Sequence, residues 1–260
     1  MGVNLRKVLG IAAIAAASMA VPAFADTDPF SRGRTNVSFK AVDGTQLHGY
    51  LAQPPGGGKA PGILMIHEWW GLNSNITALA DALASEGFIV LAADAFRGSV
   101  ARTGEEAMRQ VSDTPAAQMA SDLDDALQFL EKQPRVDAAK VAVQGFCFGG
   151  TQAMYMGTRR PDLSAVAIFY GTGPITDPAK LGSMKEAGPV LGIYGAQDGN
   201  IPVSQVEGFK RALDARGVQN TIEVYPGVGH AFVKSDNLQN GGQAQKAWNQ
   251  LVGFLKSTLK

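Results

Sequence analysis

Apolar positions follow two different patterns along this chain. Short runs of β-branched and other apolar residues are typical of buried strands, and they predict strands at 36–42, 46–52, 63–66, 88–93, 141–143, 165–170, 189–194 and 221–225. Between most of the later strands, apolar residues instead recur every three or four positions, which is the spacing of an amphipathic helix. The predicted inward-facing helical residues are Ile76, Leu79, Ala80 and Leu83; Met119, Leu123, Ala126, Leu127 and Leu130; Val206, Phe209 and Leu213; and Ala244, Trp248, Leu251 and Leu255.

The order of these elements predicts the fold class. The first two strands flank Asp43-Gly44, a dipeptide typical of tight β-hairpins. Pro54 to Pro61 contains three consecutive glycines and predicts a flexible surface loop. Strands and helices then alternate to the C-terminus. We therefore expect an α/β fold with an antiparallel start, a mostly parallel doubly wound sheet and helices on both faces.

Residues 1–25 have the features of a secretory signal peptide. Arg6 and Lys7 are followed by the apolar stretch 8–21, which is too short to span a bilayer, and Ala23-Phe24-Ala25 resembles a cleavage site. An uncleaved membrane anchor is the alternative. We expect cleavage near Ala25, export to the periplasm or the medium, and a single domain over residues 26–260.

Charge and length narrow the function classes. Cleavage would leave 235 residues with 21 basic and 23 acidic side chains, enough chain for one large core and without a strong field of either sign. Nothing in this balance favours a nucleic acid or a membrane surface as partner. We expect a monomer that acts on a small molecule.

The segment 141–157 carries the most specific chemical signal. An apolar strand leads into Gly145-Phe146-Cys147-Phe148-Gly149-Gly150, and a small-residue helix follows, which is the arrangement of a nucleophile elbow. At a helix N-terminus, Cys147 is expected to be favoured as the thiolate. The alternative is a buried cysteine that acts only as a small hydrophobe. An exported protein rarely keeps one unpaired cysteine, which favours a chemical use.

Further polar residues follow the other predicted strands. His67 and Glu68 come after the first parallel strand, and Asp94, Asp198 and His230 come after later ones. Ligands bind outside the carboxyl ends of such strands, so these side chains are candidates for one site. Cys147, Asp198 and His230 are a chemically complete set of nucleophile, orienting acid and base.

Other interpretations of these residues remain open. Asp198-Gly199 could be an ordinary turn, and His230 could be a loop histidine. The three histidines lack the spacing of metal ligands, so no metal site is expected, and His48 is predicted to be an exposed strand residue. The glycine-rich stretch 170–173 lacks the full dinucleotide fingerprint.

The chain resembles the dienelactone hydrolase family, the cysteine-using branch of the α/β-hydrolases. Three parts of the sequence carry the resemblance: His67-Glu68-Trp69-Trp70-Gly71-Leu72-Asn73, the elbow GFCFGG, and Gly195-Ala196-Gln197-Asp198 together with Gly229-His230-Ala231-Phe232. The resemblance implies a Cys147–His230–Asp198 triad with Glu68 beside the thiol, where it helps to control thiol protonation. It further implies an oxyanion hole formed by the backbone N–H groups of Trp69 and Phe148. Glu68 could instead cap the helix that follows it.

The sequence departs from the family at the substrate-binding residues. Members that act on dienelactones hold the substrate carboxylate with two arginines. Here Arg97 stands one position early and Lys234 replaces the second arginine. Lysine lacks the bidentate fork of a guanidinium. Both residues are candidates for substrate binding, and the alternative is that they are solvated surface charges.

Together these observations predict an exported hydrolase that cleaves carboxylic ester or lactone bonds through an acyl-cysteine intermediate. No cofactor is implied, and water would deacylate the enzyme with His230 as base. A broad-specificity small esterase or thioesterase is one alternative. A catalytically silent hydrolase fold that serves as a binding protein is the other, and the complete triad argues against it.

Overall fold

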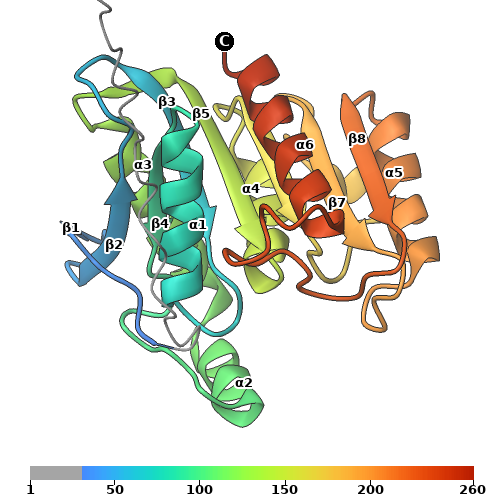
Figure 1. Ribbon diagram of the computed structural model, residues 1–260, viewed down its shortest axis with the longest axis horizontal. Coiled ribbons are helices and arrows are strands. Elements are labelled where there is room, and N and C mark those ends of the chain that lie inside the picture. The colour runs from blue at the N-terminus through green and yellow to red at the C-terminus, as the bar shows by residue number, and fades with distance from the viewer. Residues whose placement is uncertain (1–30) are drawn as a thin grey trace, which may run out of the picture.

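The computed structural model describes residues 31–260, in which eight strands form one sheet in the order β1-β2-β4-β3-β5-β6-β7-β8 (Figure 1). Strands β1 and β2 pair antiparallel, as do β2 and β4, and all further neighbours are parallel. The strands are β1 (Val37–Lys40), β2 (Gln46–Ala52), β3 (Ala60–Ile66), β4 (Ile89–Ala93), β5 (Val136–Phe146), β6 (Ala165–Phe169), β7 (Val190–Gly195) and β8 (Asn220–Tyr225). The predicted antiparallel start and parallel sheet are confirmed.

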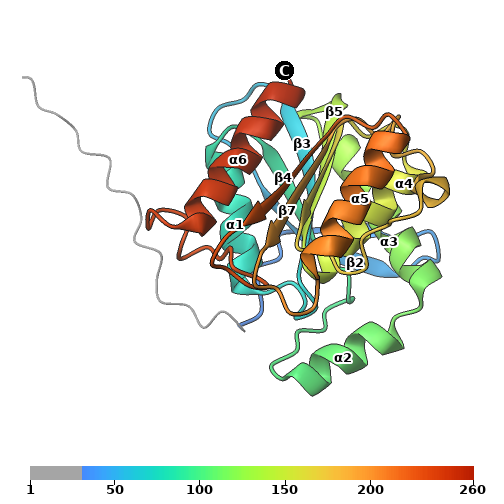
Figure 2. The same ribbon diagram turned by 90° about the vertical axis from the view of Figure 1, so that its right-hand side faces the viewer.

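Helices cover both faces of this sheet. Helices α1 (Ser74–Ser85) and α6 (Gln243–Thr258) lie on one face, and α3 (Ala116–Glu131), α4 (Phe148–Arg159) and α5 (Val203–Ala215) lie on the other (Figures 1 and 2). A short 3-10 helix, η1, spans Pro178–Leu181. Because both faces are covered, the central strands β4 and β6 are buried along their whole length and have uninterrupted apolar sequences. The edge strand β8 instead alternates between half-buried and exposed residues up to its last residue, the buried Tyr225.

Several local features differ from the prediction, among them the start of β3, which begins at Ala60 inside the expected loop. Helix α2 (Gly104–Asp113) was not expected, because its apolar stripe is short, limited to Ala107, Met108 and Val111, and the helix buries only Ala107 and Gln110. It stands off the body of the molecule at the edge where the parallel strands end (Figures 1 and 2). Its start does carry a signal in the sequence, a capping box in which Thr103 and Glu106 bond each other's backbone N–H groups. Strand β5 begins at Val136, five residues before the predicted apolar run, and its register with β3 shifts between Pro61 and Gly62.

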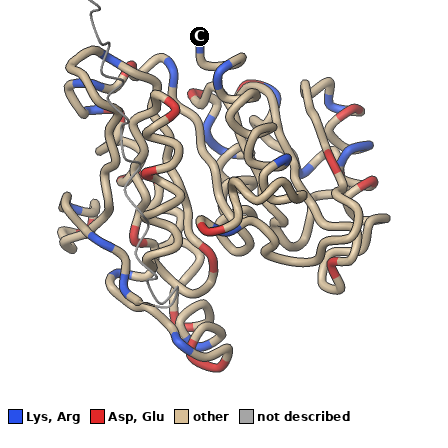
Figure 3. Tube along the Cα trace, viewed as in Figure 1, with Lys and Arg blue, Asp and Glu red and all other residues tan. Residues whose placement is uncertain are grey.

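The surface charges agree with the balanced composition. Basic and acidic residues are interspersed over the described part of the chain (Figure 3). Within residues 31–260, none of the helices has the length and apolar character needed to cross a membrane. The predicted signal peptide, residues 1–25, lies outside the described residues.

Candidate active site

Cys147 lies in the turn between β5 and α4, with φ 53° and ψ −116°. This left-handed conformation is unusual for a residue with a side chain, and such strain concentrates at functional sites. The glycines around it have a steric cause. A Cβ on Gly145 would lie 2.0 Å from the carbonyl oxygen of Gly149, and one on Gly149 would lie 2.2 Å from that of Ile66. The elbow expected from the sequence is present.

Three side chains from separate loops form a continuous chain of contacts at this elbow. Nε2 of His230 lies 3.0 Å from Sγ of Cys147, and Nδ1 of His230 lies 2.6 Å from Oδ2 of Asp198. The Asp198 side chain has no exposed surface, and its other oxygen accepts the N–H of Asn200 at 2.9 Å. A carboxylate at Nδ1 keeps the proton there, so Nε2 presents its lone pair to the thiol. Asp198 is therefore more than a turn residue, and His230 is tied into the site.

The thiol itself is harder to ionise than the sequence suggested. Burial and, next, the negative charge of Glu68 raise the pKa of Cys147 to about 11. Hydrogen bonding from the backbone N–H groups of Phe148 and Trp69, and the charge of Lys234, act in the opposite direction but do not outweigh them. The expectation that the helix N-terminus favours the thiolate is thus corrected. At neutral pH Cys147 is therefore a thiol, and Nε2 of His230 is within reach of its proton.

The same two backbone N–H groups are those expected to form an oxyanion hole. Trp69 follows β3 and Phe148 opens α4, and both N–H groups interact with the sulfur of Cys147. An acyl carbon bonded to this sulfur would have its carbonyl oxygen close to the same two donors. This geometry suits stabilisation of a developing negative charge on that oxygen.

Glu68 is held by Lys234. The lysine amine lies 3.0 Å from both carboxylate oxygens, and the Glu68 side chain is only 3% exposed. Helix α1 is capped instead by Asn73, whose side chain accepts the N–H of Ile76. The capping alternative for Glu68 is therefore wrong. Glu68 and Lys234 both lie beside the thiol of Cys147.

Arg97 is not brought to the triad. The residue has a positive φ of 50°, and its guanidinium donates to both carboxylate oxygens of Asp122 in α3 at 2.8 Å. It also bonds Asp43 and Thr45 in the β1–β2 hairpin, at 3.0 and 3.3 Å. Its candidate role in substrate binding is corrected accordingly. The donors of Arg97 are engaged in tying the hairpin to α3.

Tyr170 is a site residue that sequence reasoning missed. Its ring meets the imidazole of His230 edge-on at 5.2 Å, and its hydroxyl donates to the carbonyl of Val233 at 3.3 Å. Burial, with the nearby Glu68 and Cys147, raises the pKa of Tyr170 well above its usual value, so it remains a neutral donor. Both Tyr170 and Ala231 have positive φ, at 40° and 54°. The available signal was the position of Tyr170 directly after β6, at the edge where the other site residues stand.

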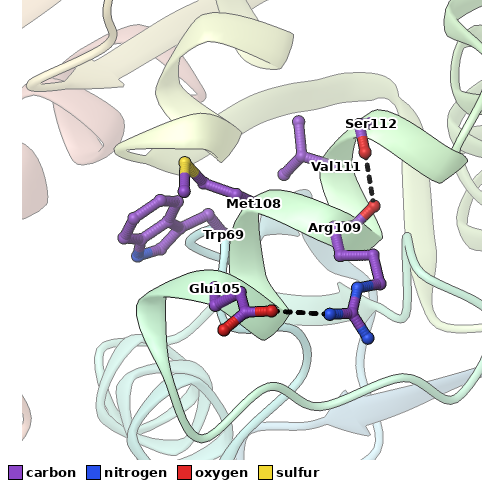
Figure 4. A pocket seen from close by; sticks show the side chains of 6 residues that line it. All are labelled: Trp69, Glu105, Met108, Arg109, Val111 and Ser112. Carbon is purple, nitrogen blue, oxygen red and sulfur yellow. Dashed lines mark hydrogen bonds and ion pairs between the residues drawn. The ribbon is translucent and has the colours of Figure 1, made fainter.

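A surface hollow of about 520 Å³ adjoins this region. Its walls come from Trp69 and from helix α2, and the residues that line it are Trp69, Glu105, Met108, Arg109, Val111 and Ser112 (Figure 4). The indole of Trp69 and the side chain of Met108 face each other, while Glu105 and Arg109 form an ion pair at 2.8 Å (Figure 4). Trp69 is the lining residue that also belongs to the site, since its backbone N–H interacts with the sulfur of Cys147. No group of three or more His, Cys, Asp or Glu suited to a metal ion occurs among residues 31–260.

The doubly wound sheet, the elbow and the order Cys147, Asp198, His230 define an α/β-hydrolase. Comparison with known proteins gives the family. The dienelactone hydrolase family model matches residues 47–259, and the chain belongs to that family.

Individual relatives agree with this assignment. The chain is 35% identical to protein Usf of Aquifex pyrophilus, over 84% of this chain and 96% of that one. It is 32% identical to a Synechocystis protein provisionally assigned as a carboxymethylenebutenolidase, over 83% and 93% of the two chains. The crystal structure of a provisionally assigned dienelactone hydrolase from Klebsiella pneumoniae superposes with a TM-score of 0.71 at 26% identity, over 85% of this chain and 99% of that one. The protein is accordingly a hydrolase enzyme.

Proposed function

We propose that this enzyme hydrolyses carboxylic esters or lactones through an acyl-cysteine intermediate on Cys147. The observation that carries the proposal is the unbroken chain from Sγ of Cys147 through His230 to Asp198, with contacts of 3.0 and 2.6 Å. A thiol, a base and an orienting carboxylate in this order are the parts that nucleophilic acyl transfer requires.

In the first half-reaction, Sγ attacks the acyl carbon while its proton moves to Nε2 of His230. The N–H groups of Trp69 and Phe148 then stabilise the oxyanion, and the Nδ1 proton stays on the imidazole, bonded to Asp198. Collapse of the tetrahedral species breaks the carbon–oxygen bond. His230 returns its proton to the leaving alkoxide, which departs as an alcohol or, for a lactone, stays tethered as a hydroxyl group.

In the second half-reaction, water attacks the thioester and His230 accepts the proton of that water. The carbon–sulfur bond breaks, and the proton returns to the thiolate. The products are the carboxylic acid and the free Cys147 thiol. With the thiol pKa raised to about 11, little thiolate exists at neutral pH, so transfer to His230 is part of the first step.

Two charged residues beside the thiol are proposed to set its protonation and the substrate preference. Glu68 disfavours the thiolate and Lys234 favours it. Lys234 is also the candidate contact for a substrate carboxylate. Because its amine is already bonded to both oxygens of Glu68, an anionic substrate has to compete for it.

Two observations favour a second candidate, a broad-specificity esterase or thioesterase for neutral substrates. Arg97 is fully engaged by Asp122 and the hairpin. The hollow beside Trp69 also has apolar walls, at Trp69, Met108 and Val111. Such a site offers one cation rather than two to an anionic group of the substrate. It offers an apolar surface to the rest of the substrate.

The experiment is a turnover assay with esters, thioesters and lactones, each in neutral and carboxylate-bearing forms. Wild type should turn over at least one class, and a stopped reaction should show Cys147 heavier by one acyl group in mass spectrometry. Cys147→Ala should lose several orders of magnitude in rate at unchanged thermal stability. Cys147→Ser should keep weak activity, because His230 and Asp198 can still activate a hydroxyl group. Retained turnover in folded Cys147→Ala would refute the acyl-cysteine route.

Location and assembly are proposals that rest on the sequence. The basic start, the apolar stretch 8–21 and Ala23-Phe24-Ala25 support export to the periplasm or the medium. The near-balanced charge gives no attraction to nucleic acid, and we propose a monomer that acts on a small molecule.

A further inference from the structure

His67 lies between strand β3 and Glu68, and its side chain has no exposed surface. The ring packs against Phe96, with ring centroids 5.1 Å apart. A fully buried imidazole cannot meet a substrate, so His67 is not a second base. Its two nitrogens are nevertheless bonded in a way that points to a role.

The hydrogen bonds of His67 define its tautomer. Nε2 lies 3.1 Å from the backbone N–H of Ala95, which can only donate, so Nε2 carries a lone pair. The ring is neutral because burial lowers the pKa of His67, against the opposing charge of Asp94. The remaining proton is therefore on Nδ1, which donates to the carbonyl oxygen of Glu68 at 2.6 Å.

We propose that His67 is a positioning residue for the oxyanion hole, which it serves by holding the Glu68–Trp69 peptide unit in place. The inference rests on the proposed ester hydrolysis. The carbonyl of Glu68 and the N–H of Trp69 are opposite ends of one planar group. Fixing the oxygen with the imidazole therefore fixes the direction in which the N–H of Trp69 points, toward the sulfur of Cys147.

Other hydrogen bonds also hold the backbone carbonyls of this segment. Gly71 also donates to the Glu68 carbonyl, at 3.2 Å, but it belongs to the same turn and would move with it. Gln110 in α2 donates to the next carbonyl, that of Trp69, and is itself held by the hydroxyl of Ser99 at 2.7 Å. His67 is thus the side chain that binds the Glu68 carbonyl, and it does so from a backbone anchored directly after the end of β3.

The hydrogen bond from His67 to the Glu68 carbonyl also affects the N–H of Trp69 in the same peptide unit. Hydrogen bonds in a chain polarise one another, so the imidazole proton on the Glu68 oxygen makes the Trp69 N–H a stronger donor. The benefit is largest when the oxyanion carries full charge, in the transition state. Loss of this bond should therefore lower kcat more than it raises KM.

Two substitutions separate the two bonds of His67. His67→Asn keeps a donor near the position of Nδ1 and loses the acceptor for Ala95. His67→Gln keeps an acceptor near Nε2 and loses the donor to Glu68. Each variant gives up one buried hydrogen bond, so we expect both to lose a similar amount of thermal stability. Thermal unfolding of the two variants checks this expectation.

Both variants and wild type are assayed on an ester and on its thionoester analogue, whose C=S group is a poor acceptor for the oxyanion donors. We expect His67→Gln to lose about ten- to a hundredfold in kcat on the ester, and clearly less on the thionoester. His67→Asn should stay within about threefold of wild type on both substrates. Equal losses on ester and thionoester, or losses that follow thermal stability in both variants, would overturn the proposal in favour of a packing role.

A measurement on the wild type keeps the test independent of folding and of turnover. The ¹⁵N chemical shifts of the three histidines should show one that keeps the neutral Nδ1–H form from pH 5 to 9, and this signal should vanish in His67→Asn. An Nε2–H form, or titration in this range, overturns the inference while leaving the proposed hydrolysis intact. An inactive wild type would instead overturn the proposed function, and this role with it.

Discussion

The amine of Lys234 lies 3.0 Å from both carboxylate oxygens of Glu68, although the two residues are 166 positions apart. The pair stands next to the thiol of Cys147 and acts on it with opposite signs. The carboxylate raises the thiol pKa and the ammonium lowers it. Burial raises the thiol pKa most and the carboxylate adds to that effect, so the net result is a pKa of about 11.

Removing the charge of Glu68 should make the thiol easier to ionise. In Glu68→Gln the repulsion of the thiolate is gone and Lys234 has no anionic partner, so the pKa of Cys147 falls below its wild-type value of about 11. The pH dependence of alkylation by iodoacetamide measures this pKa, because only the thiolate reacts. Glu105→Gln, which removes the exposed partner of Arg109, is the control and should leave the midpoint in place. A midpoint that stays or rises in Glu68→Gln would contradict the assigned direction.

Asp198→Asn should remove most of the activity without unfolding the protein. An asparagine amide can donate to Nδ1 of His230, which moves the imidazole proton to Nε2 and leaves no acceptor for the thiol proton. By analogy with other triads, kcat should fall by roughly 10³- to 10⁴-fold. Steady-state turnover and thermal unfolding measure the two effects. Asp177→Asn changes an aspartate that caps η1 at the surface and should behave like wild type. A loss below tenfold in Asp198→Asn would mean that His230 does not depend on its carboxylate.

The positions of the triad residues could be predicted because parallel strands end at one edge of the sheet. Cys147, Asp198 and His230 follow β5, β7 and β8, so chain order and strand direction suffice to bring them together. The glycines of the elbow add a steric signature that is legible in the sequence. The fold class follows from the same alternation of elements.

The side-chain directions could not be predicted. Arg97 follows β4 as a substrate clamp would, but its guanidinium bonds Asp122 and the β1–β2 hairpin instead. The salt bridge of Lys234 depends on the path of a long loop. The thiol pKa depends on the balance of a helix terminus, burial and a nearby carboxylate, and only the structure gives their relative size. Helix α2 was not predicted because its apolar stripe is only three residues long, Ala107, Met108 and Val111, and the other signal is a capping box at its start.

The export proposal gives a prediction on the residues that precede the fold. Protein recovered from the native envelope should begin at Asp26 or within a residue or two, because Ala23-Phe24-Ala25 fits the cleavage specificity of signal peptidase. It should carry one titratable thiol and no disulfide, since Cys147 is the only cysteine. Intact-mass spectrometry with thiol titration checks both. Ala25→Leu in the same host serves as the control and should block cleavage at this site. An intact N-terminus on the wild-type protein would support the membrane-anchor alternative.

Lys234 should decide whether the enzyme prefers anionic substrates. If its amine contacts a substrate carboxylate, Lys234→Ala loses a charge-assisted bond worth about 1.5 to 3 kcal/mol, or roughly ten- to more than a hundredfold in KM. The same variant also leaves Glu68 buried without its partner, which lowers the rate on every substrate. The informative quantity is therefore the ratio of kcat/KM for a carboxylate-bearing lactone to that for a neutral ester of similar size. The ratio should fall at least tenfold in Lys234→Ala and be kept or improved in Lys234→Arg, whose guanidinium can bind a carboxylate through two hydrogen bonds. An unchanged ratio with equal losses on both substrates would mean that Lys234 serves only Glu68 and the loop that carries His230, and the broad-specificity esterase would then be the better description of the enzyme.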